Sequence, residues 1–413
     1  MTAQSFAAPP APYTIDFAPQ VDDLHRRLDA ARWPEQDVVP EDVDYGEHGA
    51  FGLGAGPGLA LMKELAQDWR GQDQKQLQDH LNSYVSTTGP CFRTEPLWLT
   101  SSSLSYKNYR VEIEGLDIHF LHYPSSRADA FPLILCHGWP GGYHEFLHVL
   151  ERLTEPKDQE SRAFHVVVPS MPGYAFSSPP KTAKWGMEDT ARVFDKLMMG
   201  LGYAKYAAQG AVHLNFCPVP PPFPLNMFNP RTLLDWMPRF VLPDERRAKL
   251  ERGVAYIERG SSYYAMQNLT PRTPAYGLND SPIGLLAWIG EKMIPGIDKA
   301  VKHPNATLNR EALFTTLSIY WFTGSIGSSF LPYALNPHFG TFLVSPRHHL
   351  PNFALSNFPD ELFTPEERDA RRTGNLRWYK DAEDGGHFAA LEKPEVFAEH
   401  VREAMGVLLS DQA

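Results

Sequence analysis

The feature that most constrains this chain is an apolar run of strand length that breaks abruptly into a glycine-rich turn. Residues 132–136 read Pro-Leu-Ile-Leu-Cys, and His-Gly-Trp-Pro-Gly-Gly follows directly at 137–142. An apolar run bounded by turn residues is typical of a buried parallel strand, and here the turn lies at its carboxyl end. Open α/β sheets bind their ligands at that end of the strands. We therefore expect an α/β fold with a site near this turn.

A second run repeats the pattern. Residues 164–169 read Phe-His-Val-Val-Val-Pro, and a Met-Pro-Gly-Tyr loop follows. A helix is predicted between the two runs, at 143–153, so that the three segments form a βαβ unit with parallel strands. Upstream, the alternation of apolar and polar residues at 109–113 and 116–122 around a Glu-Gly pair predicts a hairpin.

Helical spacing of apolar residues predicts most of the remaining structure. Helices are expected at 21–32, 59–69, 72–82, 188–201, 282–292, 310–322 and 394–409, and further strands at 206–209, 341–344 and 376–380. A proline-rich link at 218–224 marks the change from sheet and helix to helix alone. The block that follows it is therefore predicted to be an inserted helical lid.

Composition argues against several classes of function. A net charge of -11 over 413 residues argues against nucleic acid as a partner. The three cysteines, Cys91, Cys136 and Cys217, form neither a disulfide framework nor a zinc motif, so a reducing, cytoplasmic location is expected. The sequence shows no signal peptide, transmembrane stretch, metal motif or nucleotide-binding loop, so no cofactor or metal is expected. The sequence does not exclude a homodimer.

Several short motifs, taken in order, resemble the microsomal-type epoxide hydrolases of fungi, which are α/β-hydrolases. They are Tyr13 to Phe17, Asp23-Leu24, Arg32 to Pro34, Gly115 to Phe120, His137 to Gly142, Pro172 to Tyr174, Val212 to Phe216, Leu286 to Lys292 and Gly385 to Glu392. The resemblance implies a mostly parallel sheet flanked by helices, a helical lid and an N-terminal extension. It also implies the cofactor-free addition of water to a small apolar epoxide, which gives a vicinal diol.

With that family as a guide, the chain divides into four parts. These are an N-terminal extension at 1–108 with a Ser/Thr-rich loop-like insertion at 84–105, a first core part at 109–222, the lid at 223–338 and a second core part at 339–413. The insertion interrupts what would otherwise be a continuous join between the third helix and the hairpin.

In that family an aspartate forms an alkyl-enzyme ester with an epoxide carbon, and a histidine with an acidic partner activates the water that hydrolyses it. By resemblance, His387 corresponds to this base and Glu361 to its carboxylate, with Asp360 as the rival acid. The plain alternatives are a histidine satisfied in its loop and an acid that starts a helix.

The resemblance also assigns residues that contact the epoxide. Tyr264 and Tyr333 correspond to the two lid tyrosines that hydrogen-bond the epoxide oxygen, and Tyr263 replaces Tyr264 if the register shifts by one. The turn from His137 contributes oxyanion and substrate contacts, with the backbone amide of Trp139 as a donor. The indoles of Trp139 and Trp288 would form apolar walls. Aromatic residues in a helical lid are otherwise more often core residues.

The nucleophile that the resemblance requires is missing from its expected place. The strand at 206–209 should run into a Gly-x-Asp-x-Gly turn and a buried helix, but Gly210 is followed directly by Ala-Val-His-Leu-Asn-Phe. No Asp, Ser or Cys lies between Gly210 and Cys217. Adjacent parallel strands need a crossover of about a dozen or more residues. We therefore expect the central strand, turn and helix unit to be missing, which would uncover apolar sheet surface and weaken the fold.

Two functions remain. The first is an epoxide hydrolase impaired at ester formation, and the second is a non-catalytic ligand-binding protein that kept the lid pocket. The insertion and the deletion together fit either an altered splice pattern or a diverged paralogue. An ester or lactone hydrolase would need a serine or cysteine at the missing turn.

Overall fold

The computed structural model describes residues 6–39, 56–82, 108–182, 184–210, 260–300, 307–336, 350–361, 364–371 and 374–410. Its described strands are β1 (Ala11–Pro12), β2 (Asn108–Ile113), β3 (Leu116–Tyr123), β4 (Phe131–Cys136), β5 (Phe164–Pro169), β6 (Ala207–Gly210), β7 (Leu350–Asn357) and β8 (Gly374–Asp381). The predicted insertion at 84–105, the strand at 341–344 and the link at 218–224 lie outside the described residues.

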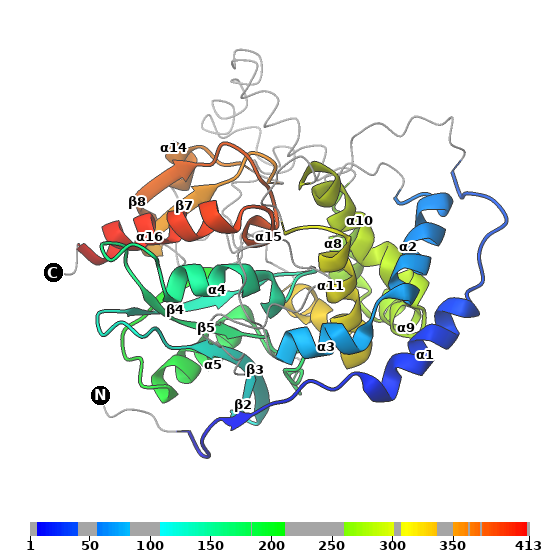
Figure 1. Cartoon of the computed structure of the whole chain (residues 1–413), viewed down its shortest axis with the longest axis horizontal. Coiled ribbons are helices and arrows are strands. Elements are labelled where there is room, and N and C mark those ends of the chain that lie inside the picture. Colours follow the sequence, from blue (N-terminus) through cyan, green and yellow to red (C-terminus); the bar gives the residue numbers. More distant parts are fainter. Residues whose placement is uncertain are drawn as a thin grey trace, which may run out of the picture.

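The described helices occur along the whole chain (Figure 1). They are α1 (Ala18–Asp29), α2 (Leu59–Gly71), α3 (Gln74–Asn82), η1 (Tyr143–Phe146), α4 (Leu147–Thr154), α5 (Met187–Gly200), α8 (Ser262–Leu269), α9 (Arg272–Asp280), α10 (Pro282–Ala300), α11 (Arg310–Thr323), η5 (Ser328–Phe330), α12 (Leu331–Ala334), α14 (Glu367–Ala370), α15 (Ala389–Glu392) and α16 (Pro394–Ser410). None of the helices within these ranges is both long and apolar enough to cross a membrane.

The main sheet is mixed. Six strands follow the order β1-β2-β3-β5-β4-β6, in which β4 pairs in parallel with β5 and with β6. The pairs β1-β2, β2-β3 and β3-β5 are antiparallel. The expectation of a mostly parallel sheet is wrong for the described six strands and holds only among β5, β4 and β6, because the N-terminal hairpin and β1 add antiparallel strands beside them. This hairpin turns at Glu114 and Gly115, which both have positive φ values.

Helices cover both faces of this sheet. The predicted βαβ unit is present, with η1 and α4 between β4 and β5. In Figure 1, α4 and α16 lie on one side of the sheet, and α5 lies on the other. Valine and leucine side chains of β4 and β5 are fully buried between these layers, as expected for strands covered on both faces.

The N-terminal helices pack on the lid, as Figure 1 shows for α1 and α2 beside α10. Trp69 of α2 is fully buried and donates its indole N–H to Ser318 Oγ of α11, at 3.0 Å. The extended segment before α1 is tied down as well, because Asn82 bonds both the N–H and the C=O of Ile15. The predicted surface helices therefore cover the lid and fasten it to the core.

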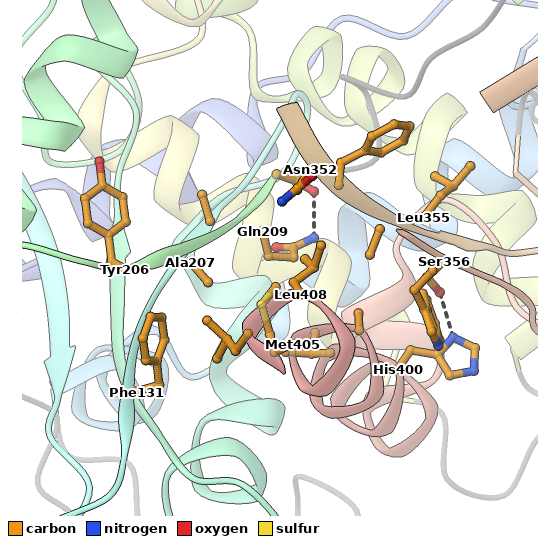
Figure 2. A pocket seen from close by; sticks show the side chains of 18 of the residues that line it. Phe131, Tyr206, Ala207, Gln209, Asn352, Leu355, Ser356, His400, Met405 and Leu408 are labelled. Carbon is orange, nitrogen blue, oxygen red and sulfur yellow. Dashed lines mark hydrogen bonds between the residues drawn. The ribbon is translucent and has the colours of Figure 1, made fainter. Parts of the chain in front are cut away.

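A second sheet of two parallel strands, β7 and β8, lies apart from the first in the described part of the chain. A groove of about 610 Å³ separates β6 from β7 and from α16, as Figure 2 shows around Gln209, Asn352 and Met405. Apart from His400, its α16 wall is apolar and includes Val401 and Leu408. The sequence predicted β8 but missed β7, because Pro351 and the flanking polar residues obscure the alternation of buried Phe353 and Leu355.

Candidate active site

His387 and Glu361 form a buried pair. His387 Nδ1 lies 2.7 Å from Glu361 Oε1, and both side chains are less than 10 % exposed. The backbone of Asp360, the rival acid, joins this loop to the one before His387, since its N–H donates to Gly385 O at 2.9 Å and the residue forms a β-bridge with Gly386. Of the two acids that the sequence offered, Glu361 is therefore the one placed to orient the imidazole.

Gly385 and Gly386, the two residues before His387, are each required to be glycine for a different structural reason. Gly385 has a φ of +98°, which side chains rarely tolerate. At Gly386, a Cβ atom would come within 3.1 Å of the backbone oxygen of Asp360. The Gly-Gly pair therefore lets the two loops approach closely enough for the histidine to reach its carboxylate.

Three buried carboxyl groups act on His387. Burial by itself disfavours the imidazolium, yet the pKa of His387 lies above its usual value because of the charge and hydrogen bond of Glu361, with further help from Glu145 and Glu392. Burial raises the pKa of Glu145 and that of Glu392 to about 7 each. Glu392 accepts the N–H of Phe388 at 2.8 Å and so holds the residue next to the histidine.

The His-Gly-Trp-Pro-Gly-Gly turn is fixed from both the core and the lid. Glu145 Oε1 accepts the N–H of Gly142 at 2.8 Å, and a Cβ on Gly141 would lie 1.3 Å from that oxygen. The hydroxyl of Tyr320, on α11, donates to Gly141 O at 3.0 Å. The peptide between Trp139 and Pro140 is cis.

His137 links two loops at the carboxyl edge of the sheet. Its Nε2 accepts the N–H of Met171, in the loop after β5, at 3.1 Å. Burial lowers the pKa of His137 to about 4, so the ring is neutral at pH 7 and able to accept this bond. The described hydrogen bond of His137 therefore holds the loop that follows β5.

The lid aromatics meet the turn at Trp139. The rings of Trp139 and Tyr263 stack with centroids 5.0 Å apart and 16° between planes. Tyr333 packs edge-on to Trp139 at 6.2 Å, and Tyr264 packs edge-on to Tyr333 at 5.5 Å. Tyr263 is buried and Tyr264 half-buried. The residue named as the alternative, Tyr263, is therefore the one in contact with the turn.

Trp288 joins the same aromatic group through Phe330. The Phe330 ring lies 6.5 Å from Trp288 and 6.4 Å from Trp139. Lys292, one helical turn after Trp288, is almost fully buried beside these rings. The aromatic walls that the sequence predicted are thus brought together at the junction of lid and core.

The strand that should lead to the nucleophile ends beside the turn. In the parallel pairing of β4 and β6, Gly210 is opposite Cys136, the residue directly before His137. The sequence continues with Ala211, and the residues from there to 259 lie outside the described part of the structure.

Sequence reasoning missed Glu145, Glu392, Tyr320 and Lys292. Glu145 had a signal, since a glutamate three residues into a helix is typical of a capping box. Glu392 and Lys292 stood in motifs that were matched as units, without a role for each residue. Within the described residues, no cluster of histidine, cysteine or acidic side chains could hold a metal ion.

Comparisons with known proteins agree on one family. The model "Epoxide hydrolase N terminus" matches residues 100–146, and "alpha/beta hydrolase fold" matches residues 132–211. A putative epoxide hydrolase of Stigmatella aurantiaca is 34% identical over 406 residues, covering 92% of this chain and 81% of the relative. Epoxide hydrolase 1 of Sus scrofa is 30% identical over 443 residues, covering 96% and 88%.

Solved structures agree on the fold. The Aspergillus niger epoxide hydrolase superposes with a TM-score of 0.73 at 28% identity, over 97% of each chain. The juvenile hormone epoxide hydrolase of Bombyx mori reaches a TM-score of 0.75 over the whole of both chains, at 23% identity. With this fold, and with the identity and coverage of its relatives, the chain belongs to the epoxide hydrolases.

Proposed function

We propose that this chain binds a small apolar epoxide between the lid aromatics and the His-Gly-Trp-Pro-Gly-Gly turn, and that its ester-forming step is lost. The observation that carries the proposal is the end of β6. Gly210 lies level with Cys136, beside the turn, and Ala211 occupies the next position in the sequence. In a Gly-x-Asp-x-Gly pattern the aspartate stands two positions after the glycine, where this sequence has Val212, and neither alanine nor valine has an atom that could attack an epoxide carbon.

The comparison with the porcine relative supports a loss of chain. That alignment runs over 443 positions, which is 30 more than this chain has residues. At least 30 positions therefore have no counterpart here. This length would accommodate the strand crossover of about a dozen or more residues that is missing after Gly210.

In this proposal the tyrosines and the histidine keep their roles in the mechanism. Tyr263 and Tyr333 would donate hydrogen bonds to the epoxide oxygen as its negative charge develops, and Tyr264 supports Tyr333. His387, oriented by Glu361, would take a proton from water. Without an ester, the only step left for this base is direct attack of its water on the epoxide, which gives the same diol.

The alternative is a non-catalytic binding protein, and the retained aromatic junction favours it over loss of all function. It predicts that the chain binds aromatic epoxides or their diols without converting them.

The test uses the purified 413-residue chain with an aromatic epoxide such as styrene oxide. Intact-protein mass spectrometry after rapid quenching should show no adduct of epoxide mass, and the chain should bind the epoxide measurably. A trapped ester would overturn the lost step, whereas multiple turnovers that leave no adduct and disappear in His387→Ala would show direct attack of water. Binding without turnover in both proteins would favour the alternative.

A further inference from the structure

Lys292 is a buried cation that the proposed reaction does not use. It lies on α10, and its side chain is only 1% exposed. Its Nζ forms an ion pair with Glu291 Oε2 at 2.6 Å, and it finds no other hydrogen-bond acceptor within the described ranges. Burial lowers the pKa of this lysine. The ammonium is withdrawn from water although the side chain of its partner Glu291 is 32% exposed, and a buried cation needs compensating contacts.

The surroundings of Lys292 point to the lid aromatics. Its Nζ lies over the ring of Tyr263, 5.1 Å from the centroid, and over the ring of Trp288 at 5.3 Å. Trp288 is four residues earlier on the same helix and so presents the same face. Tyr263 stacks in turn on Trp139. The ammonium group therefore contacts the ring of Tyr263, and that ring stacks on Trp139 in the turn at the carboxyl end of β4.

Two buried hydrogen-bond donors beside Lys292 and Tyr263 lack an acceptor. The indole N–H groups of Trp139 and Trp288 are buried, and neither finds a hydrogen-bond acceptor in the described structure. Buried donors without acceptors are costly. A ligand atom that carries lone pairs or negative charge would offset this cost, whereas a hydrocarbon would not.

We propose that Lys292 is a positioning residue that holds the Tyr263 ring against Trp139 and makes the Tyr263 hydroxyl a stronger hydrogen-bond donor to the oxygen of the bound ligand. The physical basis is electrostatic. A cation over the face of a phenol draws electron density from the ring and favours negative charge at its oxygen. This inference rests on the proposed binding of an epoxide at the same junction.

The test compares two ligands that do not react, so it needs no turnover. One is 2-phenylacetamide, whose carbonyl oxygen accepts hydrogen bonds, and the other is propylbenzene, which has a similar shape and no acceptor. Lys292→Met keeps an unbranched side chain that is one atom shorter and removes its charge. It should weaken amide binding about tenfold, the order expected for a desolvated cation–π contact, and leave propylbenzene binding within about twofold.

Two further variants complete the design. Lys196→Met removes a lysine on α5 that is ion-paired to Glu114, and it should change neither affinity. Tyr263→Phe should reproduce the loss of amide binding, and Lys292→Met added to it should weaken the amide no further. Thermal melting checks that each variant is folded, and Lys292→Gln replaces the methionine variant if that protein does not fold.

Each outcome decides something. Equal loss of both ligands in Lys292→Met would show that the lysine only packs the lid, and unchanged affinity for both would show no role, so either result overturns the inference. If the parent chain binds neither ligand, the proposed function itself fails and the inference fails with it.

Discussion

Gly210 is paired with Cys136 in parallel register, so β6 ends level with the strand that precedes the His-Gly-Trp-Pro-Gly-Gly turn. Both strands point the same way, and their carboxyl ends meet at the edge where open α/β sheets bind ligands. The proposed loss of ester formation therefore concerns the residues that follow Gly210 in the sequence. The identity of the following residues therefore decides whether the site can form an ester.

Restoring a strand crossover after Gly210 should restore turnover. We expect a chain that carries the corresponding segment of the Stigmatella aurantiaca relative between Gly210 and Ala211 to hydrolyse styrene oxide, because the retained residues supply the acid and base steps. Product formation measured by chromatography checks this. The same graft with the aspartate expected in its Gly-x-Asp-x-Gly turn changed to asparagine should bind the epoxide and stay inactive. If the intact graft folds and remains inactive, the retained residues are not competent.

The pair of His387 and Glu361 should make stability depend on pH. An imidazole whose pKa is raised by folding contributes most below its unfolded value, near 6.5, and this contribution is lost as pH rises through the folded value. Glu361→Gln should cost about 1–3 kcal/mol at pH 6 and less at pH 9. Urea unfolding at both values measures it. The exposed Glu367→Gln should cost under about 0.5 kcal/mol at either pH. An equal cost of Glu361→Gln at both values would contradict the assignment.

Glu392→Gln should stabilise the protein at neutral and higher pH. Burial raises the pKa of Glu392 from 4.5 to about 7, so the folded chain binds a proton more tightly than the unfolded one. Stability falls as pH rises from 4.5 to 7 while the wild-type carboxyl ionises. Glutamine keeps an oxygen for the N–H of Phe388 without that charge. Urea unfolding at pH 8 should show a gain of about 1–3 kcal/mol, which shrinks toward pH 4.5.

Gly141→Ala should weaken the fold by disturbing the turn. The added Cβ would overlap Glu145 Oε1, so either the carboxylate leaves the N–H of Gly142 or the backbone shifts. We expect a cost of at least about 2 kcal/mol. Gly71→Ala is the matched control, since nothing lies within 4 Å of its Cβ position at the end of α2. Its melting temperature should stay equal or rise, and an equal fall in both variants would rule out the overlap as the cause.

The groove beside α16 should accept a larger side chain. Ala404 lines the groove of about 610 Å³, so Ala404→Leu can bury apolar surface without displacing neighbours, and we expect a gain of about 1 kcal/mol. Ala398, on the same helix, is fully buried and does not line the groove. Ala398→Leu should therefore cost about 1–3 kcal/mol by overpacking. Melting temperatures compare the two, and destabilisation by Ala404→Leu would show that the space is not available.

The sequence alone determined the elements and the order in which they occur. The apolar runs at 132–136 and 164–169, the Glu-Gly hairpin and the helical periodicities are local signals, and β2 to β6 and most helices lie within a few residues of the predictions. The family resemblance also put His387 next to Glu361, since a Gly-Gly-His loop and a Pro-Asp-Glu segment are recognisable one at a time.

Only the tertiary structure decided which side chains meet. Tyr263 and Tyr264 are adjacent in sequence, but the orientation of α8 decides that Tyr263 stacks on Trp139. The burial of Lys292 and of Glu392 likewise depends on packing between elements far apart in the chain. Periodicity reports which face of a helix is apolar, whereas contact between two faces depends on how whole elements dock, which is a property of the fold rather than of any local stretch.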